Sequence, residues 1–249
     1  LAARLTAMPG PPDDLSRVGT GIDRLAEAQQ ASTEALRQVS ADIAHDLKTP
    51  IQRLSVQLAE VRGALPPNAD AAPLDRAEAE MAGIVSTFEA LLRIAQIEGG
   101  GPRARFAPVD LGALATTMAE LYDPAAEESG HHLRVTLTAP ATVQGDRTLL
   151  GQLIANLIEN ALRHSPAGGT VSLAVEGARL TLADTGPGIP PEEREAVLRR
   201  LYRLDRSRST PGSGLGLSLV EAVVKLHGGT LALQDNAPGL RVVIDLPQS

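Results

Sequence analysis

A long stripe of apolar residues runs through the first third of the chain. Apolar side chains recur there every three or four positions, the spacing of one face of an α-helix. The stripe consists of Leu36, Val39, Ile43, Leu47, Ile51, Leu54, Leu58, Val61 and Leu65. A second stripe consists of Met81, Ile84, Phe88, Leu91 and Ala95. The sequence PPNADAAP at 66–73 separates the two, and GGGP at 99–102 follows the second. The pattern predicts two long helices in an antiparallel hairpin.

A lone hairpin leaves both of its apolar stripes uncovered. Two hairpins packed as a four-helix bundle would bury them, and we expect this homodimer because the stripes are long and coiled-coil-like. The alternative is that the hairpin docks on the rest of its own chain. Proline-rich residues 1–30 are typical of a linker. We therefore expect a linker at 1–30, a dimerisation hairpin at 31–98 and a further domain at 99–249.

The remainder of the chain alternates helical and strand patterns, as α/β domains do. We expect helices at 110–128, 146–164 and 213–229. We expect strands at 132–139, at 170–186 around a turn at Glu176 and Gly177, and at 240–247. The stretch 185–216 is rich in Gly, Pro and Arg and is too long for a routine connection. Long loops of this kind are usually lids or binding loops.

Composition removes several classes of function. The formal net charge of −7 disfavours a nucleic-acid partner, and the 2% of aromatic residues argues against stacking on bases. The chain has no cysteine, which excludes disulfides and thiolate metal sites. No segment reaches the roughly 18 apolar residues of a membrane helix. Because the chain begins with Leu1, we expect a cytoplasmic piece of a longer, inner-membrane protein whose upstream part holds any membrane spans.

One histidine on the first predicted helix has unusual neighbours. His45 is two positions from both Ile43 and Leu47, so it points away from the apolar stripe and into water. Asp46 can accept a proton from one imidazole nitrogen, which makes the other more nucleophilic. Pro50 inside the helix is costly for stability alone. An ordinary surface histidine is the alternative interpretation.

Two further segments offer polar groups suited to a nucleotide. Asn156 and Asn160 are four residues apart and share a helix face. Their amide oxygens suit Mg²⁺ beside phosphates, although a solvated helix edge has the same pattern. Asp184, after a predicted strand, offers an acceptor for an exocyclic amine, and Gly186 and Gly188 permit close approach to a ring.

A glycine-rich segment leads into the last predicted helix. Gly212, Gly214 and Gly216 would present backbone N–H groups and the helix dipole to anionic phosphates. The segment follows neither the dinucleotide-binding pattern nor the Walker pattern. By itself such a loop is weak support for a phosphate site.

In their order and spacing, these segments resemble the sensor histidine kinases of two-component signalling over residues 31–249. HDLKTP at 45–50 is similar to the phosphoacceptor box of that family. The resemblance implies an α+β fold, with a dimeric helical hairpin followed by a Bergerat-type α/β sandwich. It implies that His45 is phosphorylated from ATP, that Asp46 accepts the proton, and that Thr49 orients the water of a phosphatase reaction. The phosphoryl group would then pass to an Asp on a response-regulator receiver domain.

The same resemblance implies the nucleotide contacts. Asn160 would ligate Mg²⁺, and Asn156 would assist near the phosphates. Further ATP contacts would come from Arg163, His164, Asp184, Gly186, Gly188, Arg203, Gly212, Gly214, Leu215 and Gly216. Leu198 and Leu201 stand where the family usually has Phe, and we expect them to anchor the lid by packing. Residues 13–30 resemble the end of a signal-relay module.

Two other functions remain open from the sequence. ATP-hydrolysing gyrase- and chaperone-like proteins share the ATP fold but carry Glu where this chain has Asn156; Glu159 is one residue short of Asn160 and is expected to point elsewhere. A degenerate kinase that binds ATP as a dimeric scaffold is the other alternative. The pair His131 and His132 lacks acidic or Cys partners at metal-ligand spacing, and we expect it at the surface.

Overall fold

The structure is a computed structural model, and it describes residues 21, 24, 50, 53, 54, 56–66, 70–98, 105–140, 142–204 and 213–248. His45, Asp46, Thr49 and Gly212 lie outside these residues, so the expectations for them stay predictions. Within the described ranges, no helix combines the length and the apolar character needed to cross a membrane.

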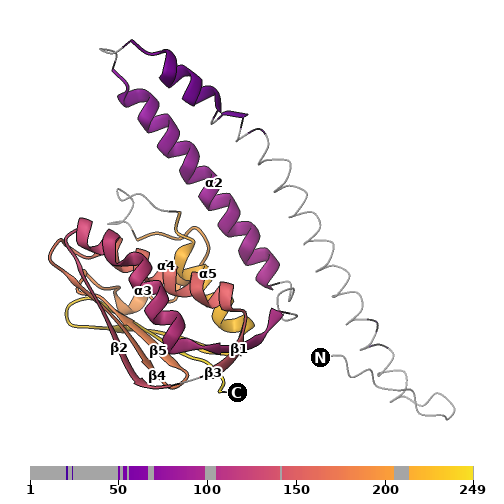
Figure 1. Cartoon of the computed structure of the whole chain (residues 1–249). Coiled ribbons are helices and arrows are strands. Elements are labelled where there is room, and N and C mark those ends of the chain that lie inside the picture. The colour runs from indigo at the N-terminus through magenta and orange to yellow at the C-terminus, as the bar shows by residue number, and fades with distance from the viewer. Residues whose placement is uncertain are drawn as a thin grey trace.

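The predicted hairpin is present in the described residues. Helical residues 56–64 run back along α2 (Ala72–Glu98), as Figure 1 shows. The Arg62 side chain crosses between the two helices and donates to Asp75 and Glu78, each over 2.5 Å. Asp70 accepts from the main-chain N–H of Ala72 over 3.0 Å at the start of α2. Several large apolar side chains of this hairpin are more than half exposed: Leu54, Val56, Val61 and Ile84.

A five-stranded mixed sheet forms the base of the second part of the chain. Its strand order is β2-β4-β5-β7-β6, with β2 parallel to β4 and the other pairs antiparallel. The strands are β2 (His132–Ala139), β4 (Thr170–Glu176), β5 (Arg179–Ala183), β6 (Thr230–Asp235) and β7 (Leu240–Asp245). Leu173, Leu182 and Val242 are aligned across three strands, and all three are buried. Alternate residues therefore face one core, as the period of a strand requires.

Three helices cover one face of this sheet. They are α3 (Leu111–Glu128), α4 (Arg147–His164) and α5 (Gly216–Leu226). Asp110 and Asp146 cap α3 and α4 by accepting hydrogen bonds from main-chain N–H groups of the first turns. The apolar faces of α4 and α5 meet the buried side of the sheet, and their large side chains, such as Ile154 and Leu219, are almost fully buried. The α+β class and the covered sheet are those expected of the Bergerat-type fold.

Three strands are absent from the sequence prediction. β1 (Ala107–Asp110) and β3 (Thr142–Gly145) pair as a small second sheet, and β6 completes the edge of the main sheet. β1 and β3 have four residues each, and β1 contains Pro108, so neither shows a strand pattern in the sequence. The long loop contains two short 3₁₀ turns, η2 (Pro191–Glu193) and η3 (Ala196–Leu198).

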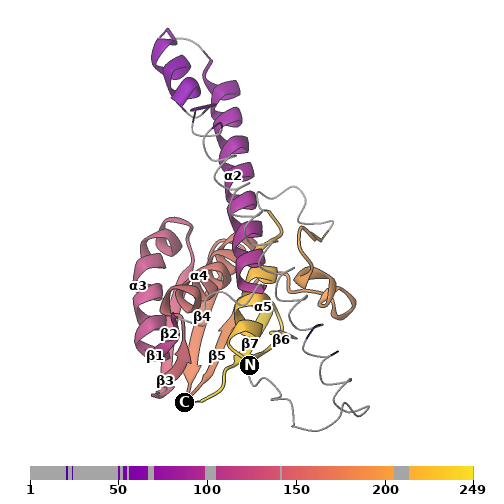
Figure 2. The ribbon, with the colours of Figure 1, turned by 90° about the vertical axis from the view of Figure 1, so that its right-hand side faces the viewer.

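The C-terminal end of α2 docks on the second part of the chain. Ile94 and Ile97 are buried, and α2 packs against α5 in the arrangement of Figure 2. Arg93 donates to the side chain of Gln152 on α4, and Arg200 pairs with Glu98. The predicted stripe ended at Ala95 and did not include Ile94 or Ile97. It was incomplete because the last turns of α2 pack against α5, a partner outside the hairpin. Docking on the same chain therefore occurs at this end of the hairpin.

The prediction for the two histidines is half wrong. His132 is exposed, whereas His131 is buried. His131 Nδ1 lies 3.0 Å from the hydroxyl of Ser129, and Nε2 lies 3.2 Å from the main-chain oxygen of Ser165. Both ring nitrogens thus have partners that join the end of α3 to the end of α4. The histidine is buried because it satisfies polar groups between two helix ends.

Candidate nucleotide-binding site

A cavity of about 1570 Å³ opens between α2, α4 and the N-terminal end of α5. The segment after β5, with Asp184 and Gly188, forms one side of it, and residues 202–204 form another. The middle of α2 supplies a wall that includes Phe88 and Leu91. The cavity is therefore shared between the hairpin and the second part of the chain.

Four predicted residues of α4 line this cavity from one helix face. Asn156, Asn160, Arg163 and His164 follow the spacing i, i+4, i+7 and i+8, while the opposite face of α4 is buried in the core. The Asn156 Nδ2 group donates to the main-chain oxygen of Gln152 over 2.8 Å. This bond turns the other end of the amide toward α5, and a Cβ added at Gly216 would lie 3.5 Å from Asn156 Oδ1.

Asp184 lies directly after β5 and is 5% exposed. Its Oδ1 accepts from the main-chain N–H of Gly186 over 2.8 Å and from that of Leu240 over 3.2 Å. Burial raises the pKa of this carboxyl, while the two N–H groups and the nearby His164 oppose the shift. A buried carboxyl at the wall of a cavity is an acceptor with a fixed direction.

The two predicted glycines after Asp184 have different roles. Gly188 lines the cavity with φ of +65°, and a Cβ there would lie 2.8 Å from the main-chain oxygen of Gly239. Gly186 does not line the cavity. It is buried behind Asp184, where a Cβ would lie 2.9 Å from Asp184 Oδ1 and 3.0 Å from the oxygen of His164. Gly186 is thus required for packing around the carboxyl rather than for direct approach to a ring.

The start of α5 closes another side of the cavity. Gly214, Leu215 and Gly216 all line it, and Leu215 is also 1% exposed, so it anchors the segment in the core. No side chain of the described residues caps the first turn of α5. The first N–H groups of a helix have no partner within the helix and suit an anion.

The long loop 185–216, which we call the lid segment, does not hold Leu201 in the packed position that we expected. Its side chain is 55% exposed and its backbone has φ of +61°, a conformation that costs a residue with a Cβ free energy. Leu201 therefore does not anchor the lid, and that prediction was wrong. Leu198 is half-buried in η3, and its neighbour Val197 is buried instead. Arg203 lines the cavity, and its contact with ATP stays a prediction.

The lid is held at two points near Leu201. The Tyr202 hydroxyl donates to Glu193 Oε2 over 2.5 Å. A Cβ added at Gly214 would lie 2.8 Å from the Tyr202 oxygen, so the two ends of segment 202–214 meet closely there.

Sequence reasoning missed several residues around the cavity. Tyr122 of α3 donates its hydroxyl to Glu159 Oε1 over 2.5 Å, and burial and that carboxylate both raise the pKa of the phenol. Glu159 is therefore engaged by α3. Asn236 donates to the main-chain oxygen of Asp184. No short motif contains either contact, because the partners are 37 and 52 residues apart.

The polar groups of the cavity fit a nucleotide with Mg²⁺. Neutral amide oxygens of Asn156 and Asn160 are the hard ligands that Mg²⁺ accepts beside phosphates. The guanidinium groups of Arg163 and Arg203 carry the charge that phosphates require, and Asp184 can accept from an amino group.

Comparisons with known proteins agree with this geometry. Residues 145–249 match the family described as histidine kinase-, DNA gyrase B- and HSP90-like ATPase. The signal transduction histidine-protein kinase/phosphatase MprB of Mycolicibacterium smegmatis is 31% identical over 243 residues, which cover 91% of this chain and 48% of that protein. Sensor protein kinase PmrB of Pseudomonas aeruginosa is 32% identical over 235 residues, covering 92% of this chain and 49% of that protein. The chain thus spans about half the length of these curated relatives.

A solved structure extends the similarity to three dimensions. The mycobacterial sensor histidine kinase MprB is 38% identical with a TM-score of 0.52, and the match covers 57% of this chain and 98% of that one. Almost the whole of that solved chain is therefore matched. Together with the cavity, the helix α4 and the sheet described above, these similarities show that the chain belongs to the sensor histidine kinases and carries their ATPase-family domain at residues 145–249.

Proposed function

We propose that this chain is the kinase core of a sensor histidine kinase, which phosphorylates itself on His45 with ATP and Mg²⁺. The observation that carries the proposal is the cavity that gathers Asn156, Asn160 and Asp184 and is bounded by α2 of the hairpin. A nucleotide in this cavity would lie against the hairpin to which the predicted phosphoacceptor belongs. The domain division 1–30, 31–98 and 99–249 is part of the same proposal.

The nucleotide would be bound by groups of different chemistry. Asp184 accepts from the adenine amino group, in a buried position where one hydrogen bond discriminates strongly. Asn160, with Asn156 beside it, holds Mg²⁺, whose chemistry is to neutralise charge on the phosphates. The N–H groups at the start of α5, the segment Gly212–Gly216 and Arg203 bind phosphate oxygens.

The reaction requires positioning more than covalent chemistry from the protein. An imidazole nitrogen of His45 attacks the γ-phosphorus, the bond from that phosphorus to the bridging oxygen breaks, and ADP leaves. Asp46 accepts the proton from the other ring nitrogen. The phosphoryl group then passes to an Asp carboxylate on a response-regulator receiver domain, and Thr49 orients water in the opposing phosphatase reaction.

The exposed apolar residues of the hairpin support a homodimer as the functional unit. Val61 and Ile84 are more than half exposed on a helix pair whose stripes are long, and a second hairpin would cover them. One curated relative is named a sensor protein kinase and the other a signal transduction histidine-protein kinase/phosphatase, so we also propose that this part works in the cytoplasm and that an upstream region connects it to the inner membrane.

Incubation with γ-labelled ATP and Mg²⁺ tests the function directly. Label that survives alkali and is lost in acid is phosphohistidine, and His45→Gln should abolish it while ATP binding persists. Unchanged labelling of His45→Gln would identify another acceptor. ATP binding without label would support a scaffold, and steady phosphate release without labelled protein would support an ATPase.

A further inference from the structure

A group of hydrogen bonds joins the β6–β7 turn, residues 236–239, to Asp184. The Asn236 side chain donates from Nδ2 to the main-chain oxygen of Asp184 over 2.8 Å. The main-chain N–H of Asp184 donates to the oxygen of Leu240 over 2.9 Å, and the N–H of Leu240 donates to Asp184 Oδ1 over 3.2 Å. The turn therefore contacts Asp184 at its carbonyl, and Leu240, the first residue of β7, contacts it at its N–H and its carboxylate.

Arg241 determines which way the Asn236 amide faces. Its Nη2 and Nε donate to Asn236 Oδ1 over 2.9 and 3.3 Å. A guanidinium group offers only donors, so the amide must present its oxygen to Arg241. The NH₂ group of the amide is thereby directed at the Asp184 carbonyl.

Gly239 brings the turn into direct contact with the Asp184 backbone. Its φ is +116°, and a Cβ at this position would lie 1.8 Å from the main-chain oxygen of Asp184. The N–H of Asn236 donates to the oxygen of Gly239 over 3.1 Å and closes the turn. There is thus little room for Asp184 to shift relative to the turn.

We propose that Asn236 is a positioning residue for recognition of the nucleotide base, and that Arg241 keeps its amide in the required orientation. This inference rests on the proposed role of Asp184 toward adenine. Asp184 Oδ1 already accepts from two main-chain N–H groups, so Oδ2 is the oxygen that accepts from a 6-amino group. The direction of that oxygen depends on the Asp184 backbone, which Asn236 holds at the carbonyl.

Asn236→Asp is the sharpest test because it keeps the shape of the side chain. The variant retains an oxygen for Arg241 but replaces the NH₂ group with an oxygen that faces the Asp184 carbonyl. Calorimetry on the whole chain compares ATP with purine riboside triphosphate, which lacks the 6-amino group. We expect the Kd for ATP to rise about tenfold, and the Kd for the analogue to change less than about twofold.

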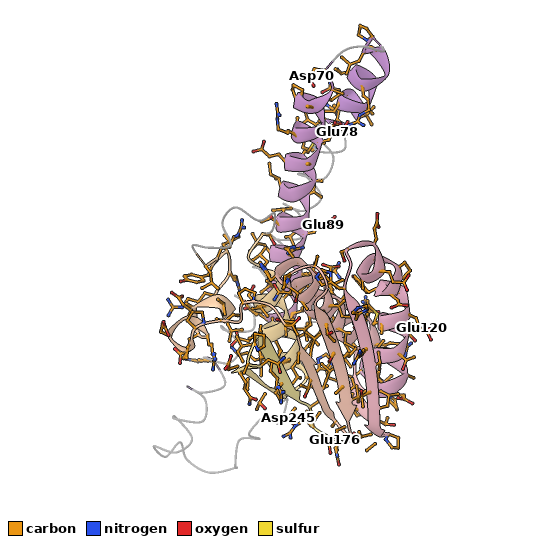
Figure 3. The ribbon with its side chains drawn as sticks, turned by 90° about the vertical axis from the view of Figure 1, so that its left-hand side faces the viewer. Asp70, Glu78, Glu89, Glu120, Glu176 and Asp245 are labelled. Atoms are coloured by element: carbon orange, nitrogen blue, oxygen red, sulfur yellow. The ribbon has the colours of Figure 1, made fainter. Side chains whose placement is uncertain are left out.

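A matched control removes a polar contact at the end of β7 that lies far from this turn. Asp245 pairs with Arg179 over 2.6 Å, and Figure 3 places Asp245 at the ends of the strands away from α2. Asp245→Asn should leave both dissociation constants at their wild-type values. An equal rise for ATP and the analogue in Asn236→Asp would mean a general structural role and would overturn the proposal.

Asp184→Asn separates failure of this inference from failure of the proposed site. If the wild type shows no preference for the 6-amino group, or if Asp184→Asn keeps that preference, the base site itself is misassigned. If Asp184→Asn abolishes the preference while Asn236→Asp retains it, only the positioning role is wrong. If Asn236→Asp does not fold, Arg241→Met provides the same test. We expect this variant to raise the Kd for ATP about threefold and to leave the Kd for the analogue unchanged. An unchanged preference for ATP over the analogue would then overturn the proposal.

Discussion

Arg93 of α2 donates a hydrogen bond to the side-chain oxygen of Gln152 of α4, one turn before Asn156. The bond joins the hairpin to the helix that carries the proposed Mg²⁺ and phosphate ligands. Ile94 and Ile97 bury the adjacent turn of α2 against the same part of the chain. A displacement of α2 therefore acts directly on the wall of the nucleotide cavity.

Ile94→Ala should destabilise this docked arrangement. Ile94 is 1% exposed, and truncation of a buried isoleucine lowers the free energy of unfolding by about 2–4 kcal/mol. Ile84→Ala, on the same helix and 58% exposed, is the matched control and should cost less than about 0.5 kcal/mol. Urea unfolding at protein concentrations where the chain is monomeric measures the free energy of unfolding of both variants. Equal losses of stability in the two variants would contradict the docking of α2.

Asp184→Asn should weaken ATP binding without weakening the fold. Burial raises the pKa of Asp184 above its ordinary value of 3.8, so the charged carboxylate is unfavourable in the folded state. The contribution of the Asp184 carboxyl to the free energy of unfolding is therefore full below pH 3.8, where the group is protonated. That contribution is lost as the pH rises through the raised pKa. The neutral amide avoids this loss and can still accept from Gly186 and Leu240.

The pH dependence of unfolding gives the measurement. Relative to the wild type, Asp184→Asn should be equally or more stable at pH 7, and the difference should vanish near about pH 3.5. ATP affinity should fall by about 1.5–3 kcal/mol. A variant clearly less stable than the wild type at neutral pH would show that the ionised carboxylate stabilises the domain.

Asn160→Ala should remove the Mg²⁺ dependence of ATP binding. Without the amide oxygen, the affinity measured with Mg²⁺ should fall about tenfold or more, while the affinity measured in EDTA should stay unchanged. Gln144→Ala, an exposed amide of β3, is the control and should retain the full Mg²⁺ effect. Equal losses with and without the metal would assign Asn160 to the nucleotide alone.

Leu201→Gly should be tolerated or should stabilise the chain. Glycine adopts a φ of +61° without the steric cost that a Cβ incurs, and the side chain that is lost is already 55% exposed. We expect the free energy of unfolding to rise by up to about 1 kcal/mol in thermal or urea unfolding. Leu198→Gly, at a half-buried position three residues earlier, should instead destabilise; the reverse order would disprove the strained backbone.

Local patterns allowed much of the architecture to be predicted. The 3.6-residue periodicity of α4 is local, and the helix lies within the predicted range 146–164. The turn at Gly177 between β4 and β5 follows from alternation and from one glycine with positive φ. The short strands β1 and β3 could not be predicted, since four residues contain too little alternation to differ from a loop.

The sequence by itself determined the helices, four of the five strands of the main sheet and the segments that supply the candidate site, because periodicity and glycine-rich turns act between near neighbours. The tertiary structure decided that Ile94 and Ile97 are buried, that Gly186 packs behind Asp184, and that Leu201 faces solvent. It also brought Asn236 to Asp184 across 52 residues, and Arg93 to Gln152 across 59. Such contacts depend on how separate elements pack together, and no local pattern of residues encodes that packing.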